Sequence, residues 1–138
     1  MSATTTQQAA TSSKGKVIGF WIATGLVGLG IIASGLANLT HAAPIMESYV
    51  KLGLPAYLGT VLGFWKTAGG IAILAPAMPR LKEWAYAGIF FNFSGAVAVH
   101  LLNGDPLAQA IAPLFLLVVT VASYLLRPDS RKLEGPAI

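Results

Sequence analysis

The chain contains no cysteine among its 138 residues, which excludes disulfides, thiolate zinc sites and CxxC redox pairs of its own. Charge is also scarce, since Asp, Glu, Lys and Arg make up 10% of the residues, whereas 55% are hydrophobic and the mean hydropathy is +0.69. The sequence also lacks a phosphate-binding loop, an HExxH motif and a nucleophile elbow. This composition is typical of a unit embedded in a lipid bilayer, and any redox chemistry would need a bound cofactor or a partner.

Four long apolar stretches predict an all-α membrane protein, a bundle of four transmembrane helices. They cover residues 17–39, 55–76, 84–102 and 106–126. Each has about the 20 residues needed to cross a hydrocarbon core ~30 Å thick. The connection at 103–106 predicts a tight turn, in which Asp105 caps the fourth span and Pro106 begins it. The connection at 41–54 predicts a short helix on the membrane surface.

The positions of the basic residues predict the orientation. The net charge of +4 does not indicate nucleic-acid binding, because the basic residues flank apolar stretches and form no patch with interleaved aromatic residues. Cytoplasmic loops of membrane proteins are enriched in Lys and Arg. We therefore expect a disordered cytoplasmic tail at 1–16, a membrane domain at 17–128 and a cytoplasmic tail at 129–138, in a cell inner (plasma) membrane. The expected cytoplasmic residues are Lys14, Lys16, Arg80, Lys82, Arg127, Arg131 and Lys132, against Lys51 on the other side.

Lys66 lies in the middle of the second predicted span. A lysine side chain reaches roughly 6 Å, whereas the nearer interface is ~15 Å away, so Lys66 must face the bundle interior, a partner or a hydrated cavity. No carboxylate lies inside any predicted span. Lys66 is therefore deprotonated, hydrogen-bonded by amide or carbonyl oxygens, or neutralised by an anionic ligand. The structural alternative is a lysine that bridges backbone carbonyls and holds the bundle together.

Asn92 is predicted to lie at the same depth as Lys66, in the third span. It is a candidate ligand-binding residue, although an interhelical hydrogen bond is the commoner use of such an asparagine. Trp65, beside Lys66, would form the wall of a site for a flat aromatic ligand, or pack within the bundle or against lipid. Gly59, Gly63 and Gly70 share the helix face of Lys66, and this stripe predicts close packing against another helix.

Two histidines and two carboxylates lie near the ends of the predicted spans. His41, Glu47 and His100 share the outer side, but their spacing matches no metal motif, so we predict no metal site. His100 is a candidate proton relay or, alternatively, an interfacial residue or helix cap. Glu83 is predicted to cap the first turn of the third span, where a carboxylate offsets the helix dipole.

Two sequence blocks resemble the DoxX-like family of small membrane proteins. They are LGFWK at 62–66 and PRLKEWAYAG at 79–88, and the similarity spans roughly residues 17–128. The resemblance implies a four-helix membrane bundle related to the small subunit of thiosulfate:quinone oxidoreductase and to membrane subunits associated with oxidative-stress enzymes. Val99 departs from the pattern, because a small polar residue is expected before the histidine. The positions that match the family are Lys66, Glu83, Trp84, Tyr86, His100 and Asp105.

Three functions compete on this evidence. In the leading hypothesis, the bundle binds a quinone or another lipophilic small molecule within or beside a membrane oxidoreductase. Lys66 and Asn92 would hydrogen-bond the ligand, Trp65 would cover its ring, and His100 would link the site to the outer surface. The alternative is a noncatalytic anchor or assembly subunit, whose glycine stripe binds a helix of a second copy or of an oxidoreductase subunit. A small proton-coupled transporter is disfavoured, since the first span holds no carboxylate.

Overall fold

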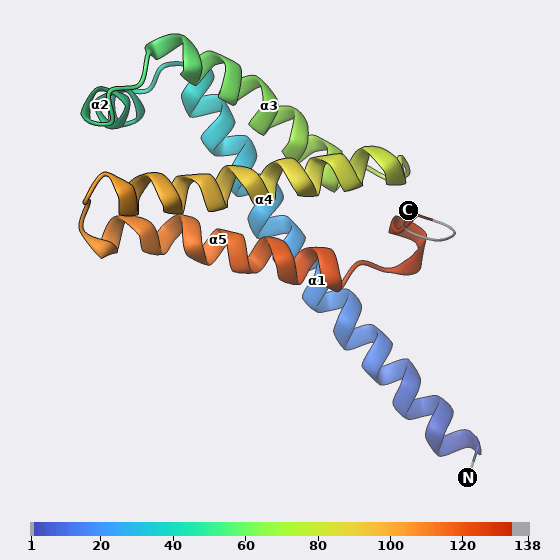
Figure 1. Cartoon of the computed structure of the whole chain (residues 1–138). Helices are drawn as coiled ribbons and strands as arrows, with labels where there is room; N and C mark the ends of the chain where they lie inside the picture. The colour runs from blue at the N-terminus through green and yellow to red at the C-terminus, as the bar shows by residue number, and fades with distance from the viewer. Residues whose placement is uncertain (1, 134–138) are drawn as a thin grey trace.

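The computed structural model describes residues 2–133, with side chains from Lys14 onward, and this range is entirely helical or looped. Four helices are long and apolar enough to cross a membrane, namely α1 from Lys14 onward, α3, α4 and α5. The predicted all-α membrane bundle is therefore confirmed. The elements, shown in Figure 1, are α1 (Ser2–Leu39), α2 (Ala43–Lys51), α3 (Ala56–Leu74), α4 (Pro79–Leu102), α5 (Leu107–Leu125) and the 3₁₀ turn η1 (Asp129–Arg131).

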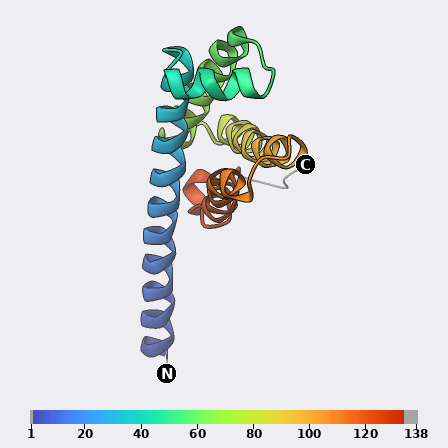
Figure 2. The same cartoon turned by 90° about the vertical axis from the view of Figure 1, so that its left-hand side faces the viewer.

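The helices form two antiparallel pairs that cross obliquely. α1 packs along α3, and α4 packs along α5, joined by the tight turn predicted at 103–106 (Figure 1). Figure 2 shows α1 as a long rod beside α4 and α5, which are seen nearly end-on in that view. α2 and the α4–α5 turn lie at one end of the bundle. The α3–α4 connection and η1 lie at the other end, which we call the basic end because it carries most of the Lys and Arg residues.

Glycines allow the backbones of α1 and α3 to come into direct contact. A Cβ atom at Gly63 would lie 2.7 Å from the carbonyl oxygen of Gly35, and one at Gly70 would lie 2.9 Å from that of Gly28. Gly59 instead faces α2, where a Cβ would lie 3.2 Å from the Met46 side chain. The predicted glycine stripe is therefore a close-packing surface, and it is filled by helices of the same chain.

The core lies where α1, α3, α4 and α5 meet, and it includes buried hydroxyl groups. The Oγ of Ser123 on α5 lies 2.6 Å from the Thr24 hydroxyl of α1 and 2.7 Å from the Tyr86 hydroxyl of α4. Because lipid cannot satisfy polar atoms, these hydrogen bonds fix the mutual positions of three helices. The apolar core residues around them are Val27, Ile31, Ile73, Tyr86, Ile89 and Phe93.

α1 is helical from Ser2, and its first turns lie in the segment 1–16 for which a disordered tail was predicted. The segment projects away from the other helices in both views (Figures 1 and 2). Extending an existing helix fixes one residue for each hydrogen bond gained, whereas starting a helix is costly. The apolar span therefore supplies the nucleus from which the polar segment continues as a helix without needing an apolar face.

The basic end corrects the predicted start of the third span. α4 begins at Pro79, five residues before the predicted position 84, and the residue before it, Met78, has a left-handed backbone with φ of 56°. Lys82 was expected in a loop, but its side chain is buried and its Nζ donates to the carbonyls of Ala72 (3.0 Å), Ala75 and Ala77 (2.6 Å). Lys82 thus satisfies one carbonyl in the last turn of α3 and two in the segment that follows it, which explains why its side chain points inward.

The segment after α5 also folds back onto the bundle. The Arg131 guanidinium donates to the carbonyl oxygens of Ile73 (3.0 Å) and Leu74 (3.2 Å), and it lies 4.7 Å from the ring centre of Trp21. The predicted tail at 129–138 is therefore docked against α1 and α3 over residues 129–133. Residues 134–138 of that prediction lie outside the described residues.

Candidate functional site: a polar pair in an apolar cavity

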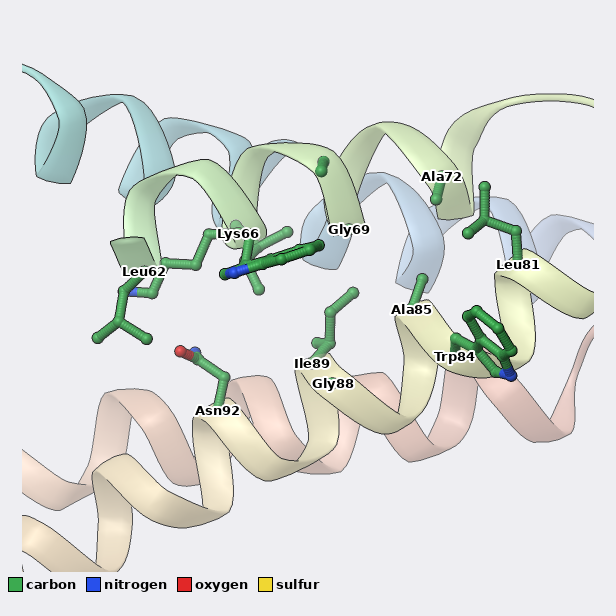
Figure 3. A pocket seen from close by; sticks show the side chains of 13 residues that line it. Leu62, Lys66, Gly69, Ala72, Leu81, Trp84, Ala85, Gly88, Ile89 and Asn92 are labelled. Carbon is green, nitrogen blue, oxygen red and sulfur yellow. The ribbon is translucent and has the colours of Figure 1, made fainter. Parts of the chain in front are cut away.

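A cavity of about 380 Å³ lies between α3 and α4, and we call it the Lys66 cavity. Among the described residues that line it, Lys66 and Asn92 carry a charged or amide side chain, and Trp65 and Trp84 add indole N–H groups. The structure therefore brings both candidate residues of the two spans into one place, together with Trp65. The remaining lining residues are Ile31, Leu62, Ala68, Gly69, Ala72, Leu81, Trp84, Ala85, Gly88 and Ile89, most of which are labelled in Figure 3.

Lys66 and Asn92 differ in how far the protein satisfies them. The Lys66 Nζ donates to the Ser34 hydroxyl of α1 over 3.2 Å. A lysine has at least two N–H donors in either protonation state, so one such bond leaves donor capacity for a ligand. Within the described residues the Asn92 amide has no side-chain hydrogen bond. In Figure 3 this amide points from α4 toward the side of α3 where Lys66 and Leu62 lie.

Two tryptophans flank the outer part of the cavity. Trp65 is 65% exposed and Trp84 is 76% exposed, so both indoles face the surroundings of the bundle. The cavity is thus reachable from the lipid side, and its opening carries amphipathic aromatic rings. Trp84 and Ser34 were missed as site residues. Two features of the sequence could have indicated them, namely a tryptophan eight residues before Asn92 and a serine in the middle of the first span.

A chain of hydrogen bonds connects the Lys66 cavity with α2. Ser34, which accepts from Lys66, also offers its backbone carbonyl to the Asn38 amide over 2.8 Å. The Tyr49 hydroxyl of α2 donates to the Asn38 carbonyl oxygen over 2.7 Å. Asn38 is buried, and burial raises the pKa of the Tyr49 hydroxyl above its ordinary value. These contacts position α1 relative to α2 and to Lys66.

Replacing Tyr49 with phenylalanine is expected to lower the free energy of unfolding by about 1 kcal/mol, because the buried Asn38 oxygen loses its donor. The pKa is raised in the folded state, so this contribution is present below the ordinary tyrosine pKa of about 10 and is lost as pH rises through the folded value. Unfolding measured from pH 8 to 11 should therefore show the stability difference between wild type and Tyr49→Phe shrinking at the alkaline end. A difference that stays constant or grows would contradict the assignment.

His100 does not line the Lys66 cavity, and its side-chain partner is Asp105 in the α4–α5 turn. Its Nδ1 lies 2.7 Å from Asp105 Oδ2, and the Asn103 amide donates to the other oxygen over 2.8 Å. The hydrogen bond with His100 is the main reason that the pKa of Asp105 is lowered. Asp105 makes no capping bond to α5, contrary to the prediction, because these loop partners use its carboxylate. His41 bonds with Thr60 (2.8 Å), and the described residues contain no cluster of metal-ligating side chains.

Glu83 also departs from its predicted capping role. The first turn of α4 has no acidic residue, since the helix begins at Pro79 and Glu83 lies beyond that turn. Its Oε1 accepts from Arg127 Nη1 over 2.6 Å, and its Oε2 accepts from the Tyr124 hydroxyl over 2.9 Å. Glu83 therefore joins α4 to the end of α5. Glu83 precedes Asn92 by nine residues, which is about 13 Å along the axis of α4. Its carboxylate forms an ion pair with Arg127.

A family model described as the DoxX-like family matches residues 22–123, from α1 through α5 and well over half of the chain. No curated protein and no solved structure matches the sequence.

Proposed function

The chain belongs to the DoxX-like family and is an integral membrane protein, and from this premise we propose that it binds a lipophilic small molecule in the Lys66 cavity. The ligand class that fits is a quinone or a similar lipophile with a carbonyl or oxyanion group. Lys66 and Asn92 would hydrogen-bond that oxygen, and Trp65 would lie against the ring. The resemblance in the sequence supports a role within or beside a membrane oxidoreductase.

The observation that carries this proposal is the lysine and asparagine pair in an otherwise apolar cavity. Free donors within a membrane protein are costly unless they find acceptors, since lipid supplies none. Lys66 has the Ser34 hydroxyl as its side-chain partner and no carboxylate beside it within the described residues. An acceptor oxygen on a ligand would complete the hydrogen bonding of both side chains.

We also propose the orientation and the manner of assembly. The basic end would face the cytoplasm of the plasma membrane, as the distribution of Lys and Arg favours. The glycine stripe is already covered by α1 and α2. A partner, either an oxidoreductase subunit or a second copy of the chain, would therefore have to dock on a different face. This arrangement weakens the alternative of an anchor that uses Gly59, Gly63 and Gly70.

Replacing Lys66 with methionine is expected to reduce the co-purified ligand at least about tenfold, since a hydrogen bond from a charged donor is lost. The protein would be purified in mild detergent, and its lipophiles would be extracted and quantified by mass spectrometry. Gly88→Leu provides a second variant that leaves Lys66 in place. A Cβ at Gly88 meets no atom within 4 Å and Gly88 lines the cavity, so the leucine is expected to extend into the cavity.

Lys51→Met is the matched control, because Lys51 is exposed on α2, outside the Lys66 cavity. It should retain the wild-type amount of ligand. The proposal is wrong if no lipophile is enriched with the wild-type protein, or if wild type, Lys66→Met and Gly88→Leu retain equal amounts.

A further inference from the structure

A second cavity, of about 320 Å³, lies between α4 and α5 near the basic end, and we call it the Glu83 cavity. It is separate from the Lys66 cavity, because α4 lies between them. Ala87 lines the Glu83 cavity, whereas its neighbour Gly88 lines the Lys66 cavity. The lining residues of the Glu83 cavity are Glu83, Tyr86, Ala87, Phe90, Thr120, Val121 and Tyr124.

Two of the three hydroxyl groups in the Glu83 cavity already donate within the protein, and the Glu83 carboxylate can only accept. The Tyr124 hydroxyl donates to Glu83, and the Thr120 hydroxyl donates to the Leu116 carbonyl over 2.6 Å. The Tyr86 hydroxyl is bonded with Ser123. Each carboxylate oxygen of Glu83 accepts one hydrogen bond from the protein and can accept a second. The cavity therefore suits a ligand that brings its own hydrogen-bond donor, the reverse of the Lys66 cavity.

Arg127 makes a positively charged ligand unfavourable in this cavity. Its guanidinium donates to Glu83 and lies 4.0 Å from the ring centre of Tyr124 and 5.3 Å from that of Tyr86. It thus neutralises the carboxylate and already occupies the cation–π position on both rings. A second cation would be repelled by the guanidinium.

The aromatic walls favour a flat ligand that enters from the lipid. Phe90 is 39% exposed and Tyr124 is 38% exposed, so the rings reach from the cavity to the surroundings of the helices. Tyr86 is buried at the inner side. Rings of this kind stack against or edge onto another aromatic ring.

We propose that the Glu83 cavity is a binding site for a neutral, lipid-soluble hydroxyaromatic molecule, such as an alkylphenol, whose hydroxyl donates to the Glu83 carboxylate. The ring lies among Phe90, Tyr86 and Tyr124, and the alkyl substituent extends into the bilayer. This site does not depend on ligand binding at Lys66.

The test uses the full chain in lipid nanodiscs with two photoreactive probes, a 4-alkylphenol carrying a diazirine and its methyl ether. The ether lacks the hydroxyl donor and carries one additional methyl group. The two probes are therefore compared at equal concentration in the bilayer. The phenol is expected to label peptides of α4 and α5 that line the Glu83 cavity, mapped by mass spectrometry. The ether should label them at least about tenfold less, as a lost hydrogen bond to a charged acceptor predicts.

Adjacent substitutions on α4 provide matched controls. Ala87→Leu should abolish the phenol-dependent labelling by filling the Glu83 cavity, whereas Gly88→Leu should leave it unchanged because it fills the other cavity. Val121→Phe, on α5, fills the Glu83 cavity from the opposite wall if Ala87→Leu does not fold. Equal labelling by phenol and ether, or phenol labelling that survives both cavity-filling variants, would overturn the proposal.

Discussion

Glu83→Gln is expected to lower the free energy of unfolding by about 3 kcal/mol, because it leaves the buried Arg127 guanidinium without a negatively charged partner. The Arg127 side chain is only 5% exposed and that of Glu83 is 24% exposed, which places the effect at the lower end of the range for buried ion pairs. Glutamine keeps the shape of glutamate, but its NH₂ group would face the donor of either Arg127 or Tyr124. The measurement is unfolding in mixed detergent with increasing SDS, followed by circular dichroism.

The ion pair between Asp129 and Lys132 provides the matched control. It also joins a carboxylate to a basic residue, with 3.1 Å between Asp129 Oδ1 and Lys132 Nζ. Its side chains are much more exposed, 98% for Asp129 and 37% for Lys132. Exposed pairs contribute little, so Asp129→Asn should change the free energy of unfolding by less than about 0.5 kcal/mol. Equal effects of the two substitutions would show that burial does not determine the contribution of Glu83.

The spans could be predicted from the sequence because a bilayer imposes one requirement on length and apolarity. α3 and α5 agree with the predictions at 55–76 and 106–126 within two residues at each end. The start of α4 was missed, since Arg80 and Lys82 look like loop residues when only polarity is considered. Lys82 lies inside the fold because it binds the carbonyls at the end of α3, a contact between two elements that a local pattern does not contain.

Depth along the helices predicted that Lys66 and Asn92 lie at one level, whereas the hydrogen-bond partner of Lys66 was not predictable. Counting from the ends of the spans placed Lys66 and Asn92 at one level, and both line one cavity. Ser34 was missed because its contact with Lys66 requires that α1 pack against α3 in one particular register. That register is set by the contact of Gly35 with Gly63, which periodicity alone does not specify.

The two carboxylates show where local rules fail. Glu83 and Asp105 were assigned to helix caps because each was predicted to lie near a helix N-terminus. Their partners in the structure are Arg127, 44 residues further along the chain from Glu83, and His100. The Arg127 guanidinium attracts the Glu83 carboxylate more strongly than the end of a helix dipole does. Asp105 is instead held by His100 and Asn103 within the α4–α5 turn.

Gly63→Leu is expected to prevent formation of the native bundle, and Gly63→Ala to destabilise it by about 2 kcal/mol or more. Even the first carbon of a side chain would lie 2.7 Å from the Gly35 carbonyl oxygen and 2.9 Å from the backbone nitrogen of Leu39. These are backbone atoms, which cannot rotate away as a side chain can, so α1 and α3 would have to separate. The separation would also break the contact between Lys66 and Ser34. Size-exclusion chromatography and SDS unfolding would measure both effects.

Gly69 provides the control on the same helix. A Cβ atom there would lie 3.7 Å from the Ile89 side chain, which is an ordinary van der Waals contact. Gly69→Ala should therefore leave stability unchanged or raise it by up to about 1 kcal/mol, because alanine favours the helical conformation more than glycine does. The two alanine substitutions would then have opposite signs although they lie less than two turns apart. If Gly63→Ala proved as harmless as Gly69→Ala, α1 and α3 could not be in backbone contact at Gly35, and the position of Ser34 beside Lys66 would also be wrong.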